Sequence, residues 1–122
     1  MGLRTIEVVS IPVSDQDRAK AFYSEVLGFT LDIEAPFAEG MRWVQLTPPG
    51  GGASISLVTW NEEMRPGSIK ELYLACDNIE ATHRDLVDKG VRFTQPVQDT
   101  PYGRFAPFVD PDGNGWSLHE GA

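Results

Sequence analysis

The first part of the chain alternates between apolar and polar positions with a period of two. The segment from Thr5 to Val13 alternates, with β-branched residues at positions 9, 11 and 13, which is typical of a strand with one buried face. The buried face carries Val9, Ile11 and Val13. We therefore expect the fold to begin with a β-strand.

A helical period follows this strand. Residues 14–17 (Ser-Asp-Gln-Asp) are a helix-start signal, with acidic side chains placed at the positive end of the helix dipole. Apolar residues recur at helical spacing from Ala19 to Leu27, and Gly28 is a typical stop. Three further strands are predicted at residues 29–33, 41–47 and 53–59, with a turn rich in Pro and Gly at 48–52.

The same order of periods then starts again. Residues 70–76 alternate like a strand, and Asp77 with Glu80 three residues later forms a capping box that predicts a helix start. The apolar stripe of this helix ends at Gly90 and consists of Ile79, Leu86 and Val87. Strands are predicted at residues 91–94, 104–109 and 116–120, the last two joined by the turn at 110–115.

This repeated order predicts the fold class. A strand, a helix and three strands occur twice, so we expect an α+β fold of two βαβββ repeats in one domain, residues 1–122. Module one spans residues 4–60 and module two spans 69–121, with a break near 61–68. If the helices cover one face of each sheet, the free faces surround a shared cavity, which gives an open cup-shaped mixed sheet with helices outside.

Strand alternation assigns side chains to these two faces. The helix side is expected to carry Val9, Ile11, Val44, Leu46, Ile55, Leu57, Leu72, Leu74, Trp116 and Leu118. The cavity side is expected to carry Val8, Ser10, Trp43, Gln45, Ser54, Ser56, Glu71, Tyr73, Ser117 and His119.

Composition and charge mainly exclude some classes of protein. A net charge of −8 without a basic cluster argues against nucleic-acid binding, which depends on neutralising phosphates. The single cysteine, Cys76, excludes an intrachain disulfide, and we expect it to be buried at a strand end and inert. The sequence has no apolar run of about 18 residues and no signal-peptide pattern, so we expect a cytoplasmic protein that does not enter membranes.

Several short motifs occur in a specific order along nearly the whole chain. The first module contains Pro12-Val13-Ser14-Asp15, Ala21-Phe22-Tyr23 and Leu27-Gly28-Phe29; the second contains residues 78–81, 89–91, 101–104 and 110–114. This order resembles the vicinal oxygen chelate superfamily, which includes glyoxalase I, extradiol dioxygenases and bleomycin-binding proteins. The resemblance implies the cup fold and a homodimer. As local structure, the same motifs are turns and helix stops, which report fold rather than chemistry.

The resemblance also implies where a metal would bind. Enzymes of this superfamily hold a divalent metal with His and Glu side chains from four strands, and those positions fall here on Val8, Ser56, Glu71 and Ser117. Valine has no donor atom, serine is a poor ligand, and one carboxylate does not hold a transition metal tightly. We therefore expect no family metal site.

Two histidines bear on this expectation. His119 lies two residues after Ser117 on the same face, so a displaced site of Glu71, His119 and water is the alternative. The commoner role for His119 is a polar residue at the cavity rim. His83 is expected to be an exposed helix residue.

Glu71 has two interpretations that the sequence leaves open. In a partly apolar cavity its pKa would rise, which suits a general base, or it could pair a cationic group of a ligand. As a structural residue it would instead cap a strand end or pair with Arg42 or Lys70.

The remaining candidates suit a small-molecule pocket, which typically has aromatic walls and a few polar groups. We expect ligand contacts from Trp43, Gln45, Ser56, Tyr73, Tyr102, Arg104, Ser117 and His119, with Trp60 and Phe105 as further candidates for stacking. For at least half of the aromatic residues, packing is the competing role. The segment from Gln95 to Arg104 is a candidate partial lid.

Three functions remain open from the sequence. The first is a metal-independent protein that binds a small molecule, such as a drug or metabolite. The second is a metal-dependent lyase, isomerase or dioxygenase that uses Glu71 and His119. The third is an interaction module whose cavity stays empty.

Overall fold

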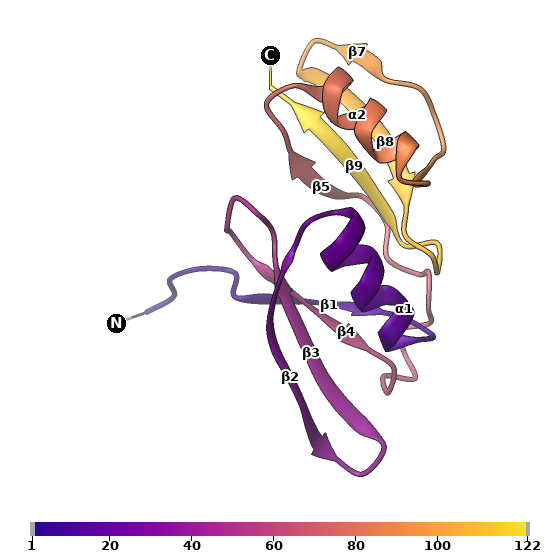
Figure 1. Ribbon diagram of the computed structural model, residues 1–122. Coiled ribbons are helices and arrows are strands. Elements are labelled where there is room, and N and C mark those ends of the chain that lie inside the picture. The colour runs from indigo at the N-terminus through magenta and orange to yellow at the C-terminus, as the bar shows by residue number, and fades with distance from the viewer. Residues whose placement is uncertain (1, 122) are drawn as a thin grey trace. The chain divides into compact units, whose positions relative to one another are not determined.

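The fold consists of two compact units of similar construction. The computed structural model describes residues 2–121. Unit 1 comprises Met1–Pro66 and unit 2 comprises Gly67–Ala122, and each has one helix and one mixed β-sheet (Figure 1). The predicted α+β class with two βαβββ repeats is therefore confirmed, with one additional short strand in unit 2. None of the helices within residues 2–121 is long and apolar enough to cross a membrane.

Unit 1 has a four-stranded sheet in the order β1-β4-β3-β2. Its strands β1 and β4 are parallel, and the other pairs are antiparallel. The elements are β1 (Val8–Pro12), α1 (Gln16–Ala21), the π-helical turn η1 (Phe22–Val26), β2 (Thr30–Ala38), β3 (Met41–Thr47) and β4 (Ser54–Val58). Helix α1 packs against β4, on the face that buries Val44, Leu46 and Leu57.

Unit 2 has a five-stranded sheet in which β5-β9-β8-β6 are neighbours and β7 also pairs with β8. Its strands β5 and β9 are parallel, and the other pairs are antiparallel. Helix α2 packs against β8 and β9 (Figure 1). The elements are β5 (Leu72–Ala75), α2 (Ile79–Asp88), β6 (Arg92–Phe93), β7 (Gln98–Thr100), β8 (Gly103–Val109) and β9 (Gly115–Glu120).

The first helix differs from the single α-helix predicted. Asp15 caps its start by accepting a hydrogen bond from the Arg18 backbone N–H at 3.1 Å, as the sequence signal indicates. After Ala21 the helix widens into η1, where the Leu27 backbone N–H donates to the Phe22 carbonyl oxygen, five residues back, at 3.1 Å. Gly28 then adopts a φ of 80° and ends it.

The predicted cap of the second helix is wrong by one residue. The N-cap of α2 is Asn78, whose side chain accepts from the Ala81 backbone N–H at 3.1 Å. Glu80 does not complete a capping box, because its carboxylate pairs with Arg104. The first N–H of the helix, that of Ile79, instead donates to Glu120 at 2.8 Å.

Strand β2 is longer than predicted and forms one edge of the unit 1 sheet. It runs for 9 residues rather than ending at Ile33, because it pairs with β3 along the whole hairpin. Pro36 and the charged residues of this stretch hide the strand in the sequence. The pairing shifts twice, between Leu31 and Ile33 and between Pro36 and Ala38, and every residue of β2 is exposed.

Candidate functional site

Unit 2 contains a hollow on the sheet face opposite α2. Its volume is about 440 Å³. Cross-strand pairing puts Tyr73, Phe105, Pro107 and Ser117 on this face, whereas Leu72, Trp116 and Leu118 belong to the face that α2 covers. Thr94, Gln95 and Gln98 complete the lining beside β8, where the Thr94 backbone N–H donates to the Pro107 carbonyl oxygen and Gln98 of β7 pairs with Phe105.

The hollow brings together three of the predicted site residues and one predicted stacking residue. Tyr73 lies beside Ser117 in the β5–β9 pair, and Glu71 lies at the entry to the same strand. The rings of Tyr73 and Phe105 meet edge to face, with centroids 5.9 Å apart. Tyr73 keeps 57% of its surface exposed, so its ring is available to a ligand.

His119 lies on the far side of Phe105. Its ring stacks on Phe105 with centroids 4.5 Å apart, and its Nε2 lies 3.1 Å from the carbonyl oxygen of Tyr102. Strand register pairs His119 with Ala75, four positions from Glu71, which corresponds to about 13 Å along the strand. At this separation the Glu71 and His119 side chains do not reach one metal ion together, which argues against the displaced site.

Glu71 has an unusual backbone conformation and an unpaired side chain. Its φ is 62°, the only positive value among the non-glycine residues that the structure describes. Neither Arg42 nor Lys70, the cations considered as structural partners, pairs with it, because both are engaged elsewhere. Arg42 donates to Asp17 at 2.9 Å, and Lys70 donates to the carbonyl oxygens of Gly67 and Gly113 at 3.0 and 3.2 Å. Within residues 2–121, no hydrogen bond or ion pair reaches the exposed Glu71 carboxylate.

The turn between β8 and β9 holds the chain that leads into Glu71. Asp110 is 3% exposed and accepts from the backbone N–H groups of Asp112 and Asn114 at 2.9 and 2.8 Å. Asn114 is fully buried and accepts from the Ile69 backbone N–H at 3.2 Å. Gly67 packs so closely on this turn that a Cβ there would overlap the carbonyl oxygen of Asp112. The turn motif at 110–114 thus fixes the position of Glu71.

The sheet of unit 1 carries an aromatic cluster instead of a charged hollow. Trp43, Trp60 and Phe37 contact one another with centroid distances of 5.0 to 6.4 Å. The Trp43 indole N–H donates to the side-chain oxygen of Gln45 at 2.9 Å. Ser56 lies beside Gln45 in the strand pairing but is fully buried, and its hydroxyl has no partner among the described residues.

Tyr102 and Arg104 are predicted ligand contacts that, like His119, lie outside the hollow. Tyr102 lies in the turn between β7 and β8 and is 80% exposed. Arg104 is held by Glu80 at 2.9 Å and Asp99 at 2.8 Å, and these two carboxylates raise its pKa further. The candidate lid from Gln95 to Arg104 is in part a β-hairpin, because β7 pairs with β8.

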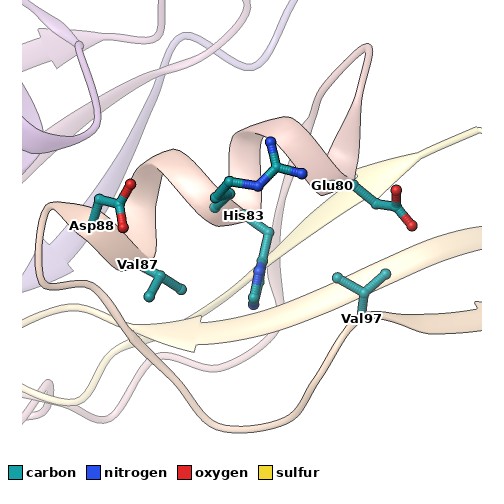
Figure 2. Close-up of a pocket in the computed structure, with 6 residues that line it drawn as sticks. Glu80, His83, Val87, Asp88 and Val97 are labelled. Atoms are coloured by element: carbon teal, nitrogen blue, oxygen red, sulfur yellow. The ribbon is translucent and has the colours of Figure 1, made fainter.

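Sequence reasoning missed a second groove, which lies along α2. It has a volume of about 370 Å³ and is lined by Glu80, His83, Arg84, Val87, Asp88 and Val97. Figure 2 shows His83 and Val87 projecting from the helix on the side of the segment that carries Val97. The expectation of an exposed His83 is wrong: its ring is half-buried and packs on Phe93 with centroids 4.3 Å apart. Only the helical spacing of residues 80, 83, 84 and 87 could have indicated this groove.

Cys76 follows β5 and is half-buried rather than buried as predicted. Desolvation raises the pKa of its thiol, and a hydrogen bond with the Thr82 side chain opposes that shift. The thiol is therefore protonated at neutral pH and a poor nucleophile.

The four positions implied for a metal do not fit one. Val8 has no donor, Ser56 is buried, and the Ser117 hydroxyl donates to the Leu118 carbonyl oxygen at 3.0 Å. In the described part of the chain, no three His, Cys, Asp or Glu side chains lie close enough to hold an ion. Glu71 is therefore the one strong donor of the implied set.

Comparisons with known proteins agree with the fold. The Bacillus subtilis (strain 168) protein YetH is 30% identical over 121 residues, which cover 97% of this chain and 99% of YetH. The crystal structure of TnmS3, an antibiotic binding protein from Streptomyces sp. CB03234, is 40% identical with a TM-score of 0.93 and covers 100% of this chain and 99% of its own. A superfamily member from Sphaerobacter thermophilus DSM 20745 is 33% identical with a TM-score of 0.88, covering 97% and 98%.

The match to a protein family extends over most of the sequence. The model of the Glyoxalase/Bleomycin resistance protein/Dioxygenase superfamily matches residues 5–118. This confirms the resemblance found in the motifs. The chain therefore belongs to the Glyoxalase/Bleomycin resistance protein/Dioxygenase superfamily.

Proposed function

We propose that this chain binds an aromatic small molecule in the hollow of unit 2, without the metal of the superfamily's enzymes. The observation that carries the proposal is the hollow itself: Tyr73 and Phe105 form aromatic walls beside positions where metal donors are replaced. A cavity of about 440 Å³ lies in the usual range for small-molecule sites. TnmS3 is an antibiotic binding protein. For this chain we propose a planar antibiotic or metabolite as the ligand.

The aromatic cluster of unit 1 supports the same ligand class. Trp43 and Phe37 offer rings for stacking, and Gln45 offers a polar group beside them. We propose this cluster as a separate ligand surface within unit 1, and a homodimer as the working form. Light scattering coupled to size-exclusion chromatography tests the dimer, and a monomer at micromolar concentration contradicts it.

Ligand binding is tested with 1-naphthalenemethanol, an uncharged probe with a planar fluorescent ring. We expect saturable binding in the presence of EDTA and a rise in melting temperature, because a ligand specific for the folded state stabilises it by mass action. Tyr73→Ala removes a wall of the hollow and should weaken binding by about tenfold, in line with the loss of one aromatic contact. Tyr102→Ala is the matched control, because Tyr102 lies outside the hollow.

Two results would overturn the proposal. One is the absence of any saturable binding by the probe. The other is tight, stoichiometric Zn, Ni, Mn or Fe after reconstitution, measured by elemental analysis and lost in Glu71→Ala. That second result would favour the metal-dependent lyase, isomerase or dioxygenase instead.

A further inference from the structure

We infer that the hollow of unit 2 selects organic cations, with Glu71 binding an ammonium group of the ligand while the ring stacks on Tyr73 and Phe105. This inference rests on the proposed function, because it names the ligand chemistry of the same hollow. All the residues and contacts that support it lie within unit 2.

The charge around the hollow is unevenly distributed. Only two of the described lining residues are charged, Lys70 and Glu71. The Lys70 ammonium donates to two backbone carbonyl oxygens, those of Gly67 and Gly113. Apart from Glu71, Lys70 and Trp116, the polar side chains that line the hollow are amides and hydroxyls. Glu71 therefore presents a carboxylate without a partner in the described chain. Such an acceptor favours a ligand that brings a positive charge and a donor.

The aromatic walls favour the same kind of ligand. Tyr73 and Phe105 turn their rings toward each other at 77°, so one ring presents its edge and the other its face. Aromatic faces attract ammonium and guanidinium groups through the ring quadrupole. A carboxylate next to aromatic rings thus suits a cation attached to an aromatic system better than it suits a neutral or anionic ring. The net charge of −8 also raises the local concentration of cations.

The backbone of Glu71 adds an independent observation. A φ of 62° is disfavoured for a residue with a Cβ, and Gly or Asn adopts it more readily. The turn at residues 110–115 holds the preceding segment through Ile69 and Gly67, so the surrounding structure imposes this conformation. Its side chain makes no hydrogen bond or ion pair within residues 2–121 that would offset this cost. A carboxylate kept at a costly position without a structural partner indicates a role toward a ligand.

The test compares three probes with one ring system: 1-naphthylmethylamine, 1-naphthalenemethanol and 1-naphthoate, which are cationic, neutral and anionic at neutral pH. Binding is measured by fluorescence titration in EDTA at low salt, so that a bridging metal does not contribute. We expect the amine to bind roughly five- to tenfold tighter than the alcohol, the range for a charge-assisted hydrogen bond at an exposed site. The naphthoate should bind most weakly.

The key variant is Glu71→Gln, which keeps the shape of the side chain and removes its charge. We expect it to reduce the preference for the amine to about twofold or less while the affinity for the alcohol stays within about twofold, because the ring contacts remain. Glu62→Gln is the matched control, since Glu62 is an exposed carboxylate outside the hollow. Circular dichroism and the melting temperature verify that each variant is folded.

The outcomes separate the two proposals. If the amine and the alcohol bind equally well, or if Glu62→Gln removes the preference as completely as Glu71→Gln, the cation site is overturned and the proposed function stands. If none of the three probes binds, both are overturned. If rising salt leaves the preference unchanged, it does not arise from an exposed carboxylate, and the inference is also overturned.

Discussion

The two sheets have the same strand order but different chemistry on the faces that their helices leave free. In unit 1 this face holds Trp43, Trp60 and Phe37 in mutual contact, and the side-chain oxygen of Gln45 accepts from the Trp43 indole N–H. In unit 2 the face is hollowed, and Glu71 is left without a partner among residues 2–121. Unit 1 also contains ion pairs, those of Lys20 with Glu34 and of Arg42 with Asp17.

The βαβββ repeat therefore specifies the fold of each unit but not the chemistry of a ligand site. Both units bury the same kind of apolar residues under one helix, such as Val44 and Leu46 in unit 1 and Ala106 and Leu118 in unit 2. Packing restricts those positions to apolar residues of suitable size. The opposite faces carry no such constraint, so one became an aromatic cluster and the other a hollow with a carboxylate.

The largest expected effect is on the segment that enters β5. Gly67→Ala should destabilise the protein by about 3 kcal/mol, because the new Cβ meets the Asp112 carbonyl oxygen and because φ is 82°. Gly50→Ala, in the turn between β3 and β4, is the control and should stay within about 0.5 kcal/mol, since no atom lies within 4 Å of the position that its new methyl group would occupy. Urea unfolding measures both, and equal effects would show that the two turns are equally tolerant.

A smaller effect distinguishes the two aromatic surfaces. Trp43→Ala should cost about 2 kcal/mol of stability, because its ring contacts Phe37 and Trp60 and its N–H is bonded to Gln45. Tyr73→Ala should cost less than about 1 kcal/mol, because Tyr73 is 57% exposed. The comparison between the two faces fails if Tyr73→Ala proves the more damaging of the two in thermal unfolding.

A third prediction concerns the backbone of Glu71 alone. Glu71→Gly and Glu71→Ala both remove the carboxylate, but only glycine relieves a φ of 62°. We expect the glycine variant to be more stable than the alanine variant by about 1 kcal/mol, which is the cost of the left-handed conformation. An alanine variant as stable as the glycine variant in urea unfolding would mean that the conformation carries no strain.

The smallest effect is a pH dependence at Cys76. Because burial raises the pKa of this thiol, it should react with iodoacetamide more slowly than the thiol of the urea-unfolded chain at pH 8. Its reaction rate should still increase with pH at values where the rate of the unfolded chain no longer changes. The raised pKa means that the stability contributed by the protonated thiol is complete below the unfolded pKa and is lost as pH rises through the folded pKa. Equal reaction rates for the folded and unfolded chains would contradict the shift.

The sequence predicted those features that depend on local periodicity. The bounds of β3 and the helix start within residues 14–17 agree with the structure because alternation and helix-start signals are read from neighbouring residues. The alternation along β5 and β9 also put Glu71, Tyr73 and Ser117 beside one hollow.

Other features depend on contacts between residues distant in sequence. Arg104 was expected to face a ligand but pairs with Glu80, 24 residues away, and this pairing also removed the expected capping box. The engagement of Lys70 by Gly113 and the positive φ of Glu71 arise from the turn at 110–115, which no local pattern near residue 71 reveals.

The long edge strand β2 has a consequence for solubility. The outer edge of this 9-residue strand presents backbone N–H and C=O groups that could pair with a second extended chain. The strand also exposes the apolar side chains of Ile33 and Phe37. Pro36 removes one of the donors that such pairing needs, and the two register shifts bend the strand away from the flat geometry of a fibril. These interruptions let the protein display large apolar side chains to water while blunting its tendency to aggregate.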